Sequence, residues 1–311
     1  MPRQIRIEYE GALYHLLNRG DRREAIFRDV VDRTTFLEVL GKTCAKTGWQ
    51  VHAYCLMTNH FHLVVETPRA NLVAGMKWLL GTYTMRFNRR HRLSGHLFAG
   101  RYKSLLIDGR DPSYLRTVCD YVPLNPARAG LVKKEKLLGS YGWSSYPSYL
   151  RAPRHRESWM RCDRLLGEHG LRKESRRNRL EFGRRTEARR IENNTNEAEA
   201  IRRGWRYGAE DFLARLLDKL AKAPTEHHRA KERNETDTEK AERILRESLA
   251  ALGWRRKDLR LRRKSDPKKV LVARQLRSQT SVSLRWIADR LEMGTWTHVS
   301  NLLAKSVKSE D

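Results

Sequence analysis

The sequence predicts two folded regions of different class: an α+β domain over residues 1–150 and an all-α domain over residues 239–311. Two observations carry this prediction. Strand-like apolar runs alternate with helical periodicity in the first region, whereas the second shows helical spacing alone. Residues 151–238, rich in Arg, Glu and Asn, indicate a basic connector that is partly helical or flexible.

The composition indicates a polyanionic partner. The chain has 64 Lys and Arg against 37 Asp and Glu, a formal charge of +27. Nucleic acid fits this charge best, with an anionic membrane surface as the alternative. No apolar run approaches the ~20 residues that span a bilayer, so we expect no membrane segment. The absence of a hydrophobic leader favours the cytoplasm, and four cysteines without a CxxC pair favour neither disulfides nor a zinc ribbon.

The elements of the first region follow from local patterns. Apolar spacing predicts strands over 12–17, 49–57 and 60–66 and within 95–107, and helices over 29–47 and 71–88. A further helix begins at Pro112, after the natural N-cap Asp111. We expect it to end at Asn125-Pro126, because the residue before a proline avoids the helical region. The run from Trp143 to Tyr146 closes the domain.

A histidine pair stands out in the third predicted strand. Side chains alternate along a strand, so His60 and His62 point to one face, ~7 Å apart, and can converge on one metal ion. Alone, such a pair is more often structural. Two imidazoles suit Zn, Mn, Ni or Cu, whereas Mg also needs an oxygen ligand. Asn125 could supply that oxygen, and Glu66 is a weaker candidate.

Tyr121 and Asn125 lie four residues apart on the helix that begins at Pro112, which places them on one helix face. The phenol oxygen could therefore reach a phosphate held by a metal beside the amide. Read alone, a tyrosine at this position is more often a core residue.

Several other residues are candidates for contact with DNA. Their basic side chains would contact phosphates, an aromatic ring could stack on an unpaired base, and a glycine would let the backbone approach a ligand. In the first region these candidates are Arg19, Gly20, Arg22, Arg86, Arg89, Arg90, Arg101, Tyr102 and Lys103.

The last region predicts four helices, over 239–252, 267–277, 284–292 and 296–305, with a solvated linker over 221–237 before them. The turn Met293-Gly294-Thr295 between the last two has the spacing of a helix-turn-helix. On its second helix, Trp296, His298 and Asn301 would face DNA.

Three ordered motifs resemble one family. CLMTNHFHLVVETP, GTYTMRFNRRH followed by GHLFAGRYKS, and YVPLNPARAGLV are together similar to the REP-associated tyrosine transposases, relatives of the single-strand insertion-sequence transposases. The opening IRIEYEGALYHLLNRGDRRE and the closing WSSY also resemble this family, so the likeness spans residues 1–150. The segment SLRWIADRLEMGTWTHVSNLLAK is similar to the helix-turn-helix of longer members.

The resemblance implies a ferredoxin-like antiparallel sheet with helices on one face, in a single-tyrosine nuclease domain of the HUH class. His60 and His62, with Asn125, would bind a divalent cation, Mg or Mn. Tyr121 would attack a phosphodiester of single-stranded hairpin DNA, such as a repetitive extragenic palindrome, giving a 5′-phosphotyrosine and a 3′-hydroxyl. The site of action would be the bacterial nucleoid. Relatives differ in whether two chains share an active site, which leaves a homodimer open.

Two positions depart from the family pattern: Pro123, where relatives often have His, and Asp21, where they often have Asn. A proline inside the helix removes a backbone hydrogen bond and bears on where Asn125 lies. Two other functions are weighed against DNA strand transfer. One is a DNA-binding regulator of the same fold without cleavage, and the other is a metallohydrolase that activates water. The intact His60, His62 and Tyr121 favour strand transfer.

Overall fold

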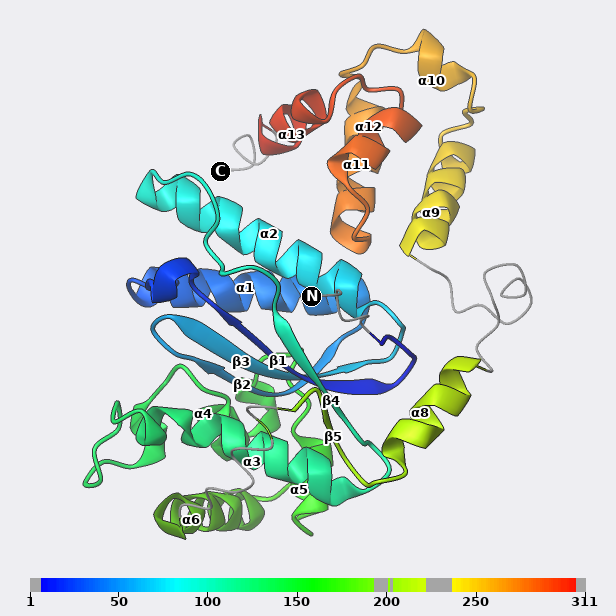
Figure 1. Ribbon diagram of the computed structural model, residues 1–311. Coiled ribbons are helices and arrows are strands. Elements are labelled where there is room, and N and C mark those ends of the chain that lie inside the picture. The colour runs from blue at the N-terminus through cyan, green and yellow to red at the C-terminus, as the bar shows by residue number, and fades with distance from the viewer. Residues whose placement is uncertain (1–6, 193–200, 202–203, 222–236, 306–311) are drawn as a thin grey trace. The chain divides into compact units, whose positions relative to one another are not determined.

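The computed structural model describes residues 7–192, 201, 204–221 and 237–305, and its contacts divide the chain into two units, Met1–Ala223 and Pro224–Asp311. The first unit is built on a five-stranded sheet of order β2-β3-β1-β4-β5 (Figure 1). The strands are β1 Ala12–Arg19, β2 Gln50–Leu56, β3 His60–Thr67, β4 Lys103–Ile107 and β5 Arg206–Tyr207. The first four pair antiparallel with their neighbours, and β5 lies parallel to β4.

Helix α1 (Val30–Thr47) connects β1 to β2, and α2 (Leu72–His91) connects β3 to β4. Together with the strand order, these crossovers give the ferredoxin-like arrangement expected from the sequence. Asp29 caps α1 by accepting a hydrogen bond from the backbone of Asp32, and Gly48 ends the helix at a φ of 77°.

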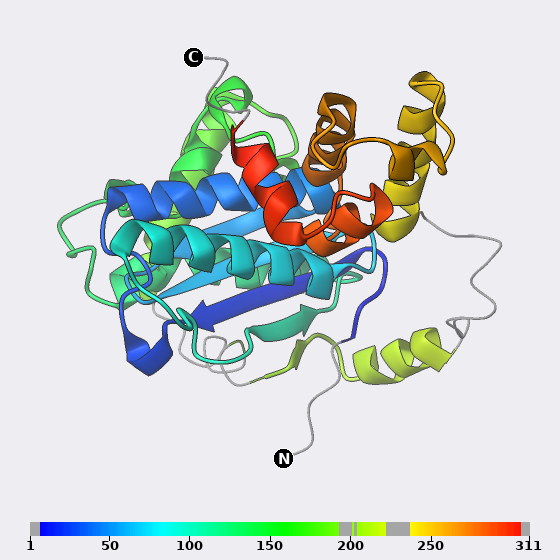
Figure 2. The same ribbon diagram turned by 90° about the horizontal axis from the view of Figure 1, so that it is seen from above.

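Helices cover both faces of the sheet, not one face as the family resemblance implied (Figures 1 and 2). Successive side chains of a strand point to opposite faces. Leu16 and Phe61 pack with α1 and α2, whereas Leu13, Val64 and Leu105 pack on the other face with α3 (Pro112–Arg128). The strands carry apolar side chains on both faces of the sheet, so helices are needed on each face to bury them.

Residues after 150 belong to the first unit, in contrast to the predicted connector. They form α4 (Tyr146–Leu150), α5 (Asp163–Glu168), α6 (Arg176–Glu192) and α8 (Phe212–Ala221). Leu165 and Phe182 are buried with α3, and Phe212 is buried with the opposite face. Helix α8 begins at Phe212, after Arg206–Tyr207 has paired with β4. The predicted linker over 221–237 lies almost wholly outside the described residues.

The free edge of β2 is covered by two later segments. The backbone N–H of Leu56 donates to the carbonyl of Trp143, and the N–H of Arg161 donates to the carbonyl of Val51. Covering an edge strand in this way prevents pairing with another chain.

A charged cluster ties the second segment to the sheet. The Glu66 carboxylate lies 2.8 Å from Arg164, 3.1 Å from Arg161 and 3.1 Å from Nε2 of His52. The hydrogen bond from His52 and the charges of the two arginines hold the pKa of the Glu66 carboxyl at about 2, below its ordinary value of 4.5. Glu66 is therefore engaged in this cluster and is not a ligand partner of His60 and His62.

The second unit is all-α, as the sequence predicts. Its helices are α9 Asp237–Ala251, α10 Asp258–Leu261, α11 Pro267–Gln279, α12 Leu284–Arg290 and α13 Trp296–Lys305. Leu245, Leu276, Ile287 and Val299 form its core. Asp266 caps α11 and Ser283 caps α12 by accepting hydrogen bonds from backbone N–H groups. None of the described helices combines the length and apolar character of a membrane span.

A buried lysine stabilises the second unit. Lys269 on α11 is fully buried, and its Nζ donates to the carbonyls of Leu259 (2.6 Å), Glu292 (3.2 Å) and Arg262 (3.3 Å). The ammonium thus joins the end of α10 to the turn after α12, although burial lowers its pKa.

Replacing Lys269 by Met should lower the free energy of unfolding of the second unit by about 2–4 kcal/mol, because the buried carbonyls lose their donor. Hydrogen exchange over residues 237–305 would measure this loss. Lys268→Met, at the exposed neighbouring position, should change the stability by less than about 0.5 kcal/mol. Equal losses in the two variants would contradict the structural role of Lys269.

Glu66→Gln should remove a pH-dependent contribution to stability. A carboxyl whose folded pKa is depressed stabilises the fold above its ordinary pKa, and this contribution is lost as the pH falls through the folded pKa. The free energy of unfolding of the wild type should exceed that of the variant by about 2 kcal/mol at pH 6. This difference should shrink as the pH falls from 4.5 to 2. Thermal melts across this range give the comparison. Glu38→Gln, at an exposed ion pair, should show no such convergence.

Candidate active site

The histidine pair lies on the face of the sheet that α3 covers. In the β1–β3 register His60 stands opposite Arg19, and His62 opposite Leu17. The rings of His60 and His62 are 5.1 Å apart between centroids, at 77° to one another. His62 is buried and His60 half-buried. The alternation expected from the sequence therefore holds.

Tyr121 projects from α3 onto the same face. Its ring lies 6.1 Å from the His62 ring, at 78°, and is 5% exposed. The fold thus brings together two sequence-predicted residues that are far apart in the chain. A tyrosine beside a pair of imidazoles is suited to act as a nucleophile on a substrate that the imidazoles help to hold.

His15 completes the cluster and was missed by the sequence analysis. Its Nε2 lies 2.9 Å from Nδ1 of His62, with the two rings stacked at 5.2 Å. Burial, and secondarily the charge of Lys103, lower the pKa of His15 to about 3, so the ring is neutral near pH 7. A lone polar residue within the apolar strand 12–17 is the signal that could have identified it.

Neighbouring groups engage the Nδ1 atoms of both imidazoles. The Asn59 amide donates from Nδ2 to the carbonyl of Arg23, so its Oδ1, 2.7 Å from Nδ1 of His60, must be an acceptor. His60 therefore carries its proton on Nδ1 and leaves the lone pair on Nε2. In His62, Nδ1 is likewise engaged, by His15. Ligating histidines in proteins have their second ring nitrogen bonded in this manner.

The residues fit a divalent cation. Burial, and secondarily the charge of Arg19, lower the pKa of His60 to about 4, which keeps it in the neutral form that a ligand requires. Within the part of the chain that the structure describes, no cluster of three His, Cys, Asp or Glu could hold a metal. A cation at His60 and His62 would thus take its remaining ligands from amide oxygens, substrate or water.

Helix α3 does not end at Asn125-Pro126 as predicted but continues to Arg128. A proline at 126 cannot donate to the carbonyl of Val122. The Asn125 side chain replaces that donor: its Nδ2 lies 3.1 Å from the carbonyl of Val122 and 3.4 Å from that of Tyr121. Asn125 is 8% exposed, and its hydrogen bonds within the described chain go to the helix backbone, with Oδ1 not used in them.

Arg128, one turn further, was also missed by the sequence analysis. Its guanidinium carbon lies 4.6 Å above the Tyr121 ring, and Nη1 donates to the Tyr121 carbonyl at 3.3 Å. This contact places a fixed positive charge beside the phenol. Lys103, on the same face of β4 as Leu105, adds a second charge, and burial lowers its pKa.

Some of the other predicted basic residues are exposed to solvent, and the rest form ion pairs with carboxylates. Those exposed to solvent are Arg19, Arg22, Arg89 and Arg101. Arg90 instead bonds to the carboxylates of Asp29 and Asp32, and Arg86 lies 3.4 Å from Glu38. These two arginines hold α2 against α1, a role that only the packing of the two helices could reveal.

Two predicted contacts serve the fold. Tyr102 is buried in the core beneath α1 and α2, so its ring does not present a face to a base. Gly20 has a φ of −59°, and a Cβ there would lie 2.2 Å from the carbonyl oxygen of Glu24. Glycine is therefore required by crowding within the loop and not by the approach of a ligand. The Gly20 N–H donates to the carbonyl of Asn59, next to His60.

In the second unit, α13 presents Trp296 and Asn301 to solvent, while His298 is half-buried and Val299 lies in the core. The two exposed residues occupy the outer face of α13 that the sequence predicted.

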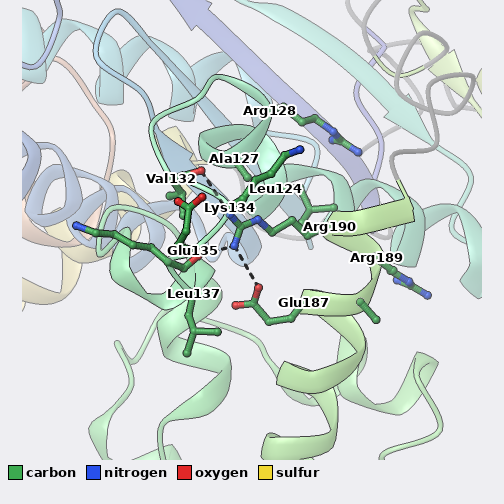
Figure 3. Close-up of a pocket in the computed structure, with 12 residues that line it drawn as sticks. Leu124, Ala127, Arg128, Val132, Lys134, Glu135, Leu137, Glu187, Arg189 and Arg190 are labelled. Atoms are coloured by element: carbon green, nitrogen blue, oxygen red, sulfur yellow. Dashed lines mark hydrogen bonds and ion pairs between the residues drawn. The ribbon is translucent and has the colours of Figure 1, made fainter.

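A pocket of about 810 Å³ adjoins the end of α3 (Figure 3). Arg190 of α6 crosses it, donates to the carbonyls of Val132 and Lys133 and pairs with Glu187. Arg128 also lines the pocket, which connects it to the Tyr121 site. Arg190 thus fastens α6 to the loop that follows the tyrosine helix.

Comparisons with known proteins bear on this geometry. Residues 8–124 match the family described as transposase, IS200 like. Among solved structures, a REP-associated tyrosine transposase bound to a REP hairpin is 16% identical, with a TM-score of 0.41 over 51% of this chain and 91% of that one. A structure from Deinococcus radiodurans R1, described as a transposase, is 18% identical, with a TM-score of 0.27 over 38% and 95% of the two chains. No curated protein matches.

The matched residues contain β1, the histidine pair and the tyrosine helix as far as Leu124. Residues 8–124 are therefore similar to the IS200-like transposases.

Proposed function

We propose that this protein cleaves and rejoins single-stranded DNA at hairpins of the repetitive extragenic palindrome type, with Tyr121 as the nucleophile. The observation that carries the proposal is the position of the Tyr121 ring, 6.1 Å from the His62 ring in a cluster of three imidazoles, two of them buried. The family match and the charge of +27 support DNA as the substrate.

The reaction exchanges one phosphoester for another. The Tyr121 phenol oxygen forms a bond to phosphorus, the bond from phosphorus to the 3′-oxygen breaks, and the phenol proton is balanced by protonation of that oxygen. The products are a 5′-phosphotyrosine and a free 3′-hydroxyl. Because the number of phosphoester bonds is unchanged, the reverse attack can rejoin a strand without ATP.

A divalent cation, Mg or Mn, would be held by Nε2 of His60 and Nε2 of His62, with Oδ1 of Asn125 as a candidate third ligand. When bound, it would supply positive charge that stabilises the transition state at the phosphate. His15 would fix the ring of His62 for this role. Arg128 and Lys103 would add attraction for the phosphate on the face where Tyr121 lies.

The exposed Arg19, Arg22, Arg89 and Arg101 are proposed contacts for the DNA backbone. In the second unit, α12, the turn 293–295 and α13 would act as a helix-turn-helix, with Trp296, His298 and Asn301 toward DNA. The proposed place of action is the bacterial nucleoid in the cytoplasm, and a homodimer with shared sites is an open alternative to the monomer.

Tyr121→Phe should abolish a covalent protein–DNA adduct, because the phenylalanine ring has no oxygen to attack phosphorus. The measurement is a denaturing gel of the full chain with single-stranded hairpin DNA and Mn or Mg. Tyr114→Phe, on the same helix but packed on Tyr207, is the matched control and should form the adduct. Cleavage that persists in Tyr121→Phe would overturn the assignment, and DNA binding without adduct under any metal would favour a non-cleaving regulator.

His15→Phe should weaken binding of Mn by about 10–100-fold, because the ring of His62 loses the partner that orients it. Calorimetric titration of the DNA-free protein with Mn measures this effect without reference to cleavage. His155→Phe, at an exposed position, should leave the affinity unchanged. Unaltered affinity in His15→Phe would show that His15 does not act through a metal ligand.

A further inference from the structure

The second unit carries a basic segment outside α13, formed by residues 255–268 and here called the basic arm. Eight of its fourteen residues are Arg or Lys and two are Asp, so it is strongly cationic. It contains α10 and the loop that leads into α11 (Figure 1). Leu259 is buried in the core of the second unit and anchors the arm there, whereas Leu261 is 84% exposed.

Acidic partners neutralise only part of this charge. The ion pairs of the arm are Arg256 with Glu242, Arg260 with Glu292, and Arg262 with Asp266. Lys257, Arg263 and Lys264 are exposed, and within residues 237–304 none of the three has an ion pair. Clustered like charges without acidic partners repel one another, and a polyanion would relieve that repulsion.

Polar contacts fix the arm beside the start of α13. Lys269 bonds to the carbonyl of Leu259 on the arm and to that of Glu292 just before the turn 293–295. The Cδ atom of Lys264 lies 3.2 Å from the position that a Cβ at Gly294 would take. The arm, and Lys264 in particular, is therefore held beside the turn that precedes Trp296 of α13.

This placement suits duplex DNA better than a single strand. The first residues of the second helix of a helix-turn-helix reach into the major groove, which brings a row of phosphates past the neighbouring loops. Proteins that bind single strands add exposed aromatic rings on which bases stack. Trp254, which directly precedes the arm, is 7% exposed and covered by the Arg262 guanidinium at 3.9 Å, so it offers no open face to a base.

We propose that the basic arm binds the sugar–phosphate backbone of double-stranded DNA beside the groove that α13 enters. The inference extends the proposed function, since it takes α13 as a DNA-reading helix. It assigns the protein a duplex-binding surface that is separate from the Tyr121 site and needs neither metal nor nucleophile. Lys269 is the positioning residue of this surface.

The test is fluorescence anisotropy of the full chain with a labelled hairpin-free duplex, titrated at several salt concentrations without divalent metal. Arg263→Gln with Lys264→Gln should reduce the slope of log K against log salt by about 2 and weaken binding roughly tenfold near 0.15 M salt. Lys257→Gln with Arg263→Gln leaves the Gly294 contact intact and should have the same effect. Arg176→Gln with Arg177→Gln, two exposed arginines of α6, makes the same charge change and should alter neither quantity.

The adduct gel separates this inference from the function of Tyr121. Arm variants should still form the adduct with a single-stranded hairpin. Unchanged duplex affinity and salt slope in both arm variants would overturn the inference, as would equal losses in the α6 control. Loss of hairpin adduct together with duplex binding would assign the arm to the single-stranded substrate instead. If wild type forms no adduct but the arm variants still lose duplex binding, the proposed strand transfer fails while the arm's role stands.

Discussion

The register between β1 and β3 is the constraint on which the site depends. It sets Leu17 opposite His62 and so places His15, two residues earlier, where its Nε2 reaches the Nδ1 of His62. A shift of one residue would turn His15 to the opposite face, toward α1 and α2. The same register leaves Phe61 in the core, so the packing that stabilises the sheet also aligns its polar groups.

The helix that carries Tyr121 to this face contains two prolines. Pro123 and Pro126 each remove a backbone donor from the helix that carries Tyr121. The side chain of Asn125 donates to the carbonyl of Val122, and that of Arg128 donates to the carbonyl of Tyr121. Arg128 also lies over the Tyr121 ring. The orientation of the phenol is therefore maintained by side chains of the same helix, together with the imidazoles it contacts.

Local patterns were enough to predict strands β1 to β4, the capped helices and the common face of His60 and His62, because alternation and capping are properties of a few adjacent residues. Such local patterns could not predict the burial of Tyr102 or the ion pairs of Arg90. Burial of Tyr102 depends on the helices that cover its side of the sheet, and the partners of Arg90 are supplied by α1.

The same distinction explains the predicted connector and His15. The apolar residues after position 150, such as Phe182, are too sparse to show a period, and their burial requires a face of α3 that is remote in sequence. His15 was visible as a polar residue in an apolar strand, but only its bond to His62 gives it a role. Its pairing is long-range, and single-sequence periodicity does not contain that information.

Asn125 illustrates why the side chain there is an amide and not an acid. An aspartate would offer a better oxygen to a hard cation, but it would set a carboxylate against the carbonyls of Val122 and Tyr121, with no proton to share with either. The amide can satisfy the helix through its nitrogen while its oxygen stays available and uncharged. A carboxylate at position 125 would leave the Val122 carbonyl without this donor, so the amide that compensates for Pro126 also supports the helical turn that carries Tyr121.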